Sequence, residues 1–298
     1  MPVFTGAELG WYEVLVVAVG GAILAYFGAR WFERPAVRWG LVSRRRRDRF
    51  SARRISLAGG PGLLIGCIAV YAALRRAPPA GVIVGGLGFF GLGLWDDRFE
   101  LRPFQKASLQ TLIAIVAAAL LVPGPVDIGV GVLIFLILVN ASNYLDNMDG
   151  LLTGVALAQA AALVLVRIEL GPGAAPLLFA LPGILLLTWA PATVYLGDSG
   201  SHLVGALFAA ETLQILYEDG SAHPVRIVPL LVLFGVPLLD AATVSISRLR
   251  RKRPLFRGGT DHLSHRLVRL GFPVRGAVTV LVLASAVCGI ASLVLAHF

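Results

Sequence analysis

The sequence contains little charge and almost no cysteine. Only 14% of its 298 residues are charged and 57% are hydrophobic, and the mean hydropathy is +0.81. A soluble domain carries about 25% charged residues, so the composition excludes an ordinary soluble protein and predicts several membrane spans. Cys67 and Cys288 both lie in apolar stretches, which excludes a disulfide framework and a cysteine-based zinc site. No basic residue precedes Arg30, a pattern unlike a cleavable signal peptide.

Long apolar segments dominate the rest of the chain. Their runs are continuous rather than alternating, which favours helices over a closed barrel, because backbone groups in lipid must bond within the segment. No internal repeat or long linker divides residues 1–298, so we expect one polytopic membrane domain. The ten segments fall at about 11–29, 57–74, 80–95, 106–122, 127–141, 151–167, 175–190, 201–217, 225–244 and 274–296. The sequence therefore predicts an all-α integral membrane protein with about ten transmembrane helices.

Basic residues are distributed unevenly among the connecting segments. If the N-terminus is outside, 22 of the 26 lysines and arginines fall on the cytoplasmic side and 4 on the other. This asymmetry predicts a plasma-membrane protein with both termini outside. The net charge of +9 then indicates contact with anionic membrane lipid rather than nucleic acid.

Four polar clusters interrupt the apolar pattern, and all four fall on the predicted cytoplasmic side. The first contains Asp96 and Asp97, followed by Glu100 and Lys106. Adjacent carboxylates repel each other at a membrane interface unless a cation neutralises them. A solvated loop with acids paired to neighbouring arginines is the alternative reading.

The second cluster ends an apolar segment. Asn140, Asn143 and Asn147 recur at the spacing of one helix face, with Asp146 among them and Asp149 just after. Asparagine and aspartate can cap helix ends, but five such side chains within ten residues exceed what capping requires. We therefore favour a functional site.

The third cluster, Gly197-Asp198-Ser199-Gly200-Ser201, precedes an apolar segment. Its glycines permit close backbone approach, and the N-terminus of the helix that follows favours phosphate. Asp198 could also serve simply as an N-cap.

The fourth cluster contains His262, His265 and Arg266, after a basic run at 248–253. Two histidines suggest a metal site, yet zinc would need a third ligand, so contact with phosphate is the better interpretation. For the basic run alone, we prefer a role in setting the membrane orientation and in binding lipid. Together the clusters predict magnesium-assisted phosphoryl transfer at a cytoplasmic cleft, because carboxylates hold the ion and cations neutralise the developing charge.

The set of motifs resembles the polyprenyl-phosphate N-acetylhexosamine-1-phosphate transferase superfamily, over about residues 50 to 270. A looser match runs from Arg54 to Gly60, where a proline of the family's segment is replaced. The matching residues are Asp96-Asp97, Asn140-x-x-Asn143-x-x-Asp146-x-x-Asp149-Gly150, Gly197-Asp198-Ser199-Gly200-Ser201 and His262-x-x-His265-Arg266-Leu267.

The resemblance implies a ten-helix fold and a reaction between a UDP-amino sugar and polyprenyl phosphate, such as undecaprenyl phosphate, with release of UMP. It implies Mg²⁺, with Mn²⁺ as a substitute. The implied roles are catalysis by Asp96 and Asp97, metal binding by Asp198 and Asp149, and substrate binding by Lys106, Asn140, Asn143, Asp146, His262, His265 and Arg266. A homodimer is one assembly that the sequence allows.

Several alternatives remain at this stage. The branch that acts on UDP-MurNAc-pentapeptide in peptidoglycan synthesis carries three clustered histidines, whereas this chain has His-x-x-His, like the branch that uses simpler UDP-N-acetylhexosamines for cell-surface glycans such as lipopolysaccharide or teichoic acid. A transporter would place charges at mid-membrane with repeat symmetry, whereas the acidic motifs here cluster at one face. Asp240, inside the ninth span, is an exception that we interpret as a helix-packing residue. A CDP-alcohol phosphotransferase would need a compact acidic motif that the sequence lacks.

Overall fold

The computed structural model describes residues 10–43, 54–75, 77–167, 170–252 and 259–297. Within these ranges the regular structure is helical, apart from two isolated bridges that join Ser56 to Val42 and to Val194. The helices are α1 (Trp11–Arg38), α2 (Gly59–Ala73), α3 (Ala80–Phe99), α4 (Pro103–Ala119), α5 (Pro125–Leu145), α6 (Leu151–Arg167), α7 (Ala174–Thr188), α8 (Gly197–Leu216), η2 (Glu218–Gly220), η3 (Pro224–Arg226), α9 (Ile227–Leu233), α10 (Gly235–Arg250), α11 (Leu263–Arg269) and α12 (Val274–His297).

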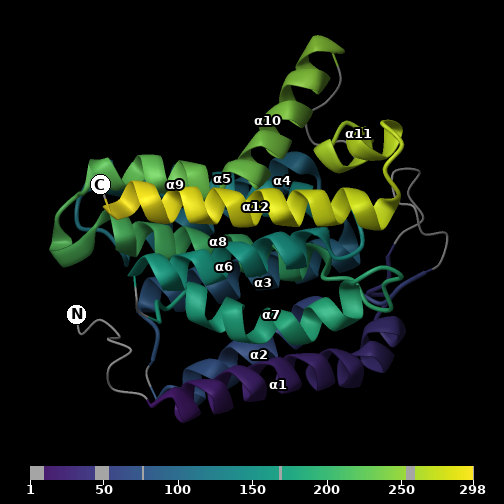
Figure 1. The fold of residues 1–298 in the computed structure, drawn as a ribbon, viewed down its shortest axis with the longest axis horizontal. Coiled ribbons are helices and arrows are strands. Elements are labelled where there is room, and N and C mark those ends of the chain that lie inside the picture. Colours follow the sequence, from purple (N-terminus) through teal and green to yellow (C-terminus); the bar gives the residue numbers. More distant parts are fainter. Residues whose placement is uncertain (1–9, 44–53, 76, 168–169, 253–258, 298) are drawn as a thin grey trace.

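Every predicted apolar segment lies on a helix, and the ninth segment is broken in two. The chain bends by 77° between η3–α9 and α10. The break falls at Phe234, next to Gly235 and shortly before Pro237. Glycine and proline both weaken the helical hydrogen-bond ladder, so this sequence accommodates a sharp bend. As a result α10 projects from the bundle beside α11 (Figure 1).

Helix α8 occupies the centre of the bundle. It packs against α3 and α5, and of its 20 residues only Asp198 and Gln214 are not fully buried. Neighbouring helices therefore enclose α8 on all sides, although it carries buried polar residues such as His202 and Glu211. Small residues allow the neighbouring backbones to approach closely: a Cβ on Gly205 would lie 2.5 Å from the Cα of Val139 on α5.

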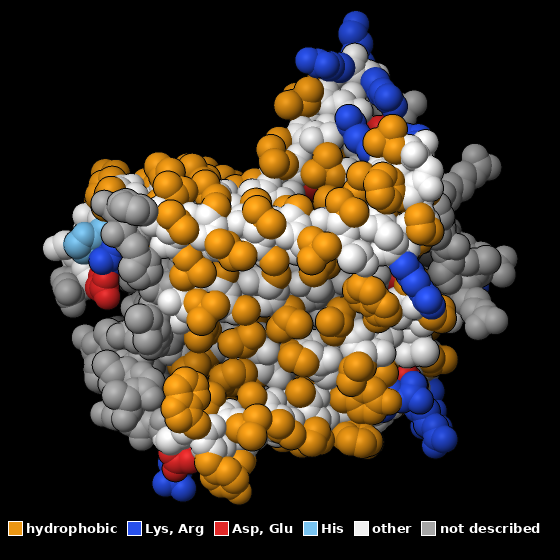
Figure 2. All heavy atoms as spheres, viewed as in Figure 1, with side chains coloured by type: hydrophobic (Ala, Val, Ile, Leu, Met, Phe, Trp, Pro, Cys, Tyr) orange, Lys and Arg blue, Asp and Glu red, His pale blue; other side chains and the backbone are white. Residues whose placement is uncertain are grey.

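The outer helices present a broad apolar surface. Hydrophobic side chains cover the face formed by α1, α7, α6 and α12, while lysines and arginines gather at the tip of α10 and along one edge (Figure 2). Among the described residues, α1, α5 and α12 are long and apolar enough to cross a membrane, and the bent pair is a fourth candidate. Helices of 15 to 17 residues span only about 22–26 Å, less than the roughly 30 Å hydrocarbon core. The all-helical prediction is confirmed, and the count of ten spans stays a prediction.

Helix α1 begins and α12 ends at the same end of the bundle, away from α11 (Figure 1). This agrees with termini on one side of the membrane, and the basic asymmetry predicts that this side is external.

In a protein without Cys67 and Cys288, a cysteine at the exposed Gly10 should react with an impermeant maleimide on intact cells. A cysteine at the exposed Trp39, beyond the other end of α1, should react only after lysis. The reverse labelling pattern would contradict the orientation.

Candidate active site

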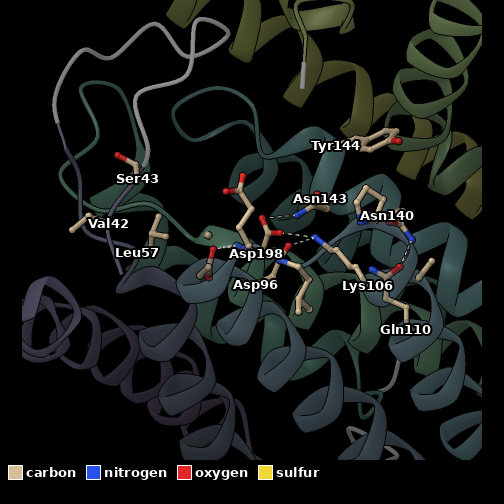
Figure 3. Close-up of a pocket in the computed structure, with 16 residues that line it drawn as sticks. Val42, Ser43, Leu57, Asp96, Lys106, Gln110, Asn140, Asn143, Tyr144 and Asp198 are labelled. Carbon is tan, nitrogen blue, oxygen red and sulfur yellow. Dashed lines mark hydrogen bonds and ion pairs between the residues drawn. The ribbon is translucent and has the colours of Figure 1, made fainter. Parts of the chain in front are cut away.

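Four helices surround a polar cavity of about 340 Å³. Helix α3 contributes its last turn, α4 and α8 contribute their first turns, and α5 contributes its C-terminal turns (Figure 3). Six of the predicted site residues line the cavity: Asp96, Asp97, Lys106, Asn140, Asn143 and Asp198. Motifs that are separated by as many as a hundred residues in the sequence therefore meet in one place.

Lys106 joins the first and third motifs. Its Nζ lies 2.7 Å from Oδ2 of Asp96 and 2.6 Å from Oδ2 of Asp198, and Figure 3 shows the ammonium group between the two carboxylates. The three side chains are 18%, 12% and 30% exposed for Lys106, Asp96 and Asp198. An ion pair this sheltered is screened much less by salt than a surface pair. The solvated-loop reading of the first motif does not describe this arrangement.

Amide side chains of α5 complete one wall. Asn143 donates from Nδ2 to Oδ1 of Asp198 and to Oγ of Ser201, at 3.0 Å each. Asn140 donates to Oε1 of Gln110 at 3.1 Å. Gln110 lies one helical turn after Lys106 on α4 and is buried. These contacts fix the carboxylate of Asp198 and leave amide groups on the cavity surface.

Asp97 anchors the start of α8. Its two carboxylate oxygens accept hydrogen bonds from the backbone amides of Asp198 at 2.8 Å and Ser199 at 3.0 Å. A carboxylate at a helix N-terminus satisfies amides that have no intrahelical partner and interacts favourably with the helix dipole. Gly197 adopts φ +68°, and a Cβ there would lie 2.7 Å from Oδ2 of Asp97. The contact therefore requires glycine, and Asp97 positions Asp198.

The three carboxyl groups have different proton affinities. All three lie outside the apolar segments that we assign to the membrane. Burial, followed by Asp198, raises the pKa of Asp96, and the same causes raise the pKa of Asp97 to about 8 although the two amides oppose this. Burial is also the largest influence on Asp198 and disfavours its ionisation, but Lys106, His202 and a hydrogen bond from Asp96 together outweigh burial and hold the pKa of Asp198 well below its usual range. Asp198 is the carboxylate that stays charged, and Asp96 and Asp97 hold a proton more readily.

The carboxylate oxygens of the cavity suit a hard divalent ion that is bound by protein and substrate together rather than by the protein alone. Among the described residues, no group of three or more histidine, cysteine, aspartate or glutamate side chains is arranged to hold a metal. Magnesium is usually bound by one or two carboxylates, several waters and substrate phosphates. The oxygens of Asp198 and Asp96 meet that description, with Lys106 between them. The residues present therefore fit a magnesium site that substrate completes.

Asp149 lies outside the lining of this cavity. Its carboxylate accepts hydrogen bonds from the backbone amide of Ala192 and the hydroxyl of Tyr195, at 3.0 Å each. These contacts hold the segment that leads into α8. The amides of Gly59 and Gly60 bond to the same segment at Tyr195 and Leu196. Asp149 thus supports the third motif, and its predicted role as a metal ligand stays a prediction.

The fourth motif forms a second group, next to the bend. Asp240 of α10 is fully buried and accepts from Nδ1 of His262 at 2.8 Å and from the amide of Leu263 at 2.7 Å. Asp240 therefore fixes both the histidine ring and the first amide of α11. His265 is buried one turn further on, with its ring 5.8 Å from that of His262. None of the three residues lines the cavity.

Helix α5 links the two groups through its C-terminal end. Tyr144 lines the cavity, its ring meets the ring of His262 edge-on at 6.1 Å, and the guanidinium of Arg248 lies over it at 5.5 Å. Beyond it, Oγ of Ser264 donates to Oδ1 of Asn147 at 2.6 Å. The histidines therefore sit behind the cavity wall. Asp146 follows α5 as its C-cap, also outside the cavity lining, and Arg266 lines a separate groove between α10 and α11.

Three residues of the site were not predicted from the sequence. Gln110 carried a signal, because it is a polar residue within the apolar segment 106–122. Asp240 is likewise a polar residue within an apolar segment, 225–244, and the structure shows that it bonds to the histidine motif rather than only packing between helices. Tyr144 carried none, because an aromatic residue at the end of a span is common at membrane interfaces.

Comparison with known proteins identifies the family. A model of glycosyl transferase family 4 matches residues 79–216. A provisionally named glycosyltransferase of Streptomyces coelicolor is 35% identical over 300 residues, which cover 95% of this chain and 70% of that protein. The chain belongs to glycosyl transferase family 4.

Other similar proteins have more specific names. An undecaprenyl-phosphate alpha-N-acetylglucosaminyl 1-phosphate transferase of Yersinia pestis is 28% identical, over 84% of this chain and 76% of that protein. A decaprenyl-phosphate N-acetylglucosaminephosphotransferase of Mycolicibacterium smegmatis is 27% identical, over 94% and 81%. The superfamily resemblance drawn from the motifs is confirmed, and the six predicted residues that line the cavity fall within the segment that the family model matches.

Proposed function

We propose that this family 4 membrane enzyme transfers an N-acetylhexosamine-1-phosphate from a UDP-sugar to a polyprenyl phosphate and releases UMP. The observation that carries the proposal is the meeting of Asp96, Lys106 and Asp198 in one cavity. Carboxylates for a metal ion, a cation for phosphate and amides for a sugar or nucleotide then lie within reach of one substrate. The names of the relatives support the same reaction.

In the proposed reaction, an oxygen of the lipid phosphate attacks the β-phosphorus of the UDP-sugar. The bond from that phosphorus to the oxygen bridging to the α-phosphate breaks, and UMP leaves with the electron pair. Mg²⁺, or Mn²⁺ in its place, would neutralise the charge on the diphosphate oxygens. Asp198 with Asp96 would hold the ion, and Asp97 would keep Asp198 in place.

The remaining side chains would bind and orient the substrates. Lys106 would move from the carboxylates toward a phosphate oxygen as charge develops there. Asn140 and Asn143 would contact the donor from the α5 wall. We assign the histidines and Arg266 to the donor phosphates or sugar as the family resemblance implies, which requires the wall at Tyr144 to shift or the donor to reach past it.

A donor panel tests the proposal and separates it from its rivals. The purified protein would be mixed with undecaprenyl phosphate, magnesium and one donor at a time, and UMP and lipid products would be measured by mass spectrometry. We expect product with a simple UDP-N-acetylhexosamine and none with UDP-MurNAc-pentapeptide or CDP-alcohols. Reaction only with the pentapeptide donor would move the enzyme to the peptidoglycan branch. Uptake of a solute into proteoliposomes without UMP release would favour the transporter.

A further inference from the structure

A second polar groove lies between α10 and α11, separate from the acidic cavity. It has a volume of about 350 Å³ and shares no lining residue with that cavity. Most of the lining comes from side chains on one face of α10 and at its C-terminal end, and α11 adds Arg266. The lining residues are Thr243, Ile246, Ser247, Arg250, Arg251 and Arg266.

The groove has far more positive than negative charge. Asp261 is the only acidic residue from position 241 to the C-terminus, against nine lysines and arginines. Its carboxylate lies 3.3 Å from Arg251 and 3.8 Å from Arg248 and accepts from Ser247 at 3.2 Å. The Nε of Arg266 donates to the backbone oxygen of the same residue at 3.2 Å. One carboxylate cannot neutralise the three arginines that line the groove, so the groove favours a further anion.

The surroundings of the groove indicate where that anion comes from. Leu239, Ile246 and Leu249 on α10 are 62%, 50% and 65% exposed, and Figure 2 shows hydrophobic side chains below the basic tip of the projecting helix. Apolar side chains topped by arginines match the boundary between acyl chains and headgroups. A ligand that carries both a phosphate and acyl chains fits this boundary better than a soluble anion.

We propose that the α10–α11 groove binds the phosphate headgroup of an anionic bilayer phospholipid. Arg250 and Arg251 provide paired N–H donors that match phosphate oxygens, and the hydroxyls of Thr243 and Ser247 supply further donors. Ile246 at the same groove contacts the start of the acyl chains. The bound lipid holds α11, and with it the histidine motif, against α10. The inference needs only that the protein lies in a membrane, so it stands apart from the proposed reaction.

Lipid binding to the purified full-length protein tests this site. Native mass spectrometry would measure the dissociation constants of phosphatidylglycerol and phosphatidylcholine for the wild type and for Arg250→Gln/Arg251→Gln. We expect the wild type to prefer phosphatidylglycerol, and the double variant to bind it about thirtyfold more weakly, from roughly 1 kcal/mol for each arginine. The matched control is Arg34→Gln/Arg38→Gln, which removes the same charge from exposed positions at the end of α1.

The control separates a defined site from diffuse attraction. Diffuse attraction predicts equal losses in the two double variants, and that result would overturn the proposal, as would a wild type without lipid preference. Arg250→Glu, a change at an exposed helix end, should weaken binding without affecting the fold, which the melting temperature checks. Displacement of phosphatidylglycerol by inorganic phosphate, or by a polyprenyl phosphate at equal concentration, would reassign the groove to a soluble anion or to the acceptor. Retention against both supports the phospholipid.

Discussion

Asp198→Asn should lower the rate of UMP release by at least about a hundredfold, and the activity that remains should need far more magnesium. Asparagine keeps the size of the side chain, and Asp198 lies in the first turn of α8 rather than at its N-cap, which is Leu196, so the fold should survive. The charge is lost, however, and the new amide group can point a donor at Lys106, whose Nζ lies 2.6 Å from the present carboxylate. Both effects weaken the proposed metal site.

Asp127→Asn provides the matched control for this variant. Asp127 also lies in the first turn of a helix, α5, but at the end opposite the cavity, so its removal should leave both the rate and the magnesium requirement unchanged. Magnesium titrations of UMP release would be compared for the three proteins. An Asp198→Asn enzyme with a normal rate and a normal magnesium requirement would limit Asp198 to a structural role as the partner of Lys106 and Asn143.

Lys106→Gln should also abolish most activity, by about a hundredfold or more, but with the opposite effect on metal binding. The ammonium group occupies the space between Asp96 and Asp198 at 2.7 and 2.6 Å. Without it two carboxylates face each other, and a divalent ion gains a stronger site because no fixed cation competes. Manganese binding, followed by electron paramagnetic resonance, should therefore tighten while turnover falls.

Lys252→Gln makes the same chemical change at the only other lysine, which is exposed. It should alter neither turnover nor manganese affinity. Weaker manganese binding in Lys106→Gln would show that the lysine organises the carboxylates rather than competing with the ion. Unchanged turnover in Lys106→Gln would mean that the Lys106 bridge between Asp96 and Asp198 is only a structural ion pair.

Most of the helical fold could be predicted from the sequence. Nine of the ten apolar segments coincide with a single helix and the ninth with a bent pair, because continuous apolar runs leave the backbone no other way to satisfy its hydrogen bonds in lipid. The bend at Phe234 could not be predicted with the same assurance, since glycine and proline also occur inside straight helices, such as Pro182 in α7. The projection of α10 depends on tertiary packing.

The candidate site was predictable in its residues and less so in its arrangement. Motif order and the basic asymmetry place Asp96, Lys106 and Asp198 at one end of the bundle, but only the structure shows that one lysine bridges the two carboxylates. The motifs alone predict that Asp149 and the two histidines belong to one site. In the structure Asp149 bonds to the segment that precedes α8, and His262 bonds to Asp240. The sequence could not reveal this, because hydrogen bonds between distant segments leave no pattern in it.

The most direct test follows the phosphorus atoms of the donor. UDP-N-acetylglucosamine labelled at the sugar-linked phosphate would be incubated with the purified protein, undecaprenyl phosphate and magnesium, and the lipid and nucleotide products would be separated. Transfer of sugar-1-phosphate predicts label in the lipid fraction, as a diphosphate-linked sugar, and unlabelled UMP in equal amount. Label that remains on the nucleotide as UDP, with a lipid that gained the sugar alone, would contradict the proposed reaction.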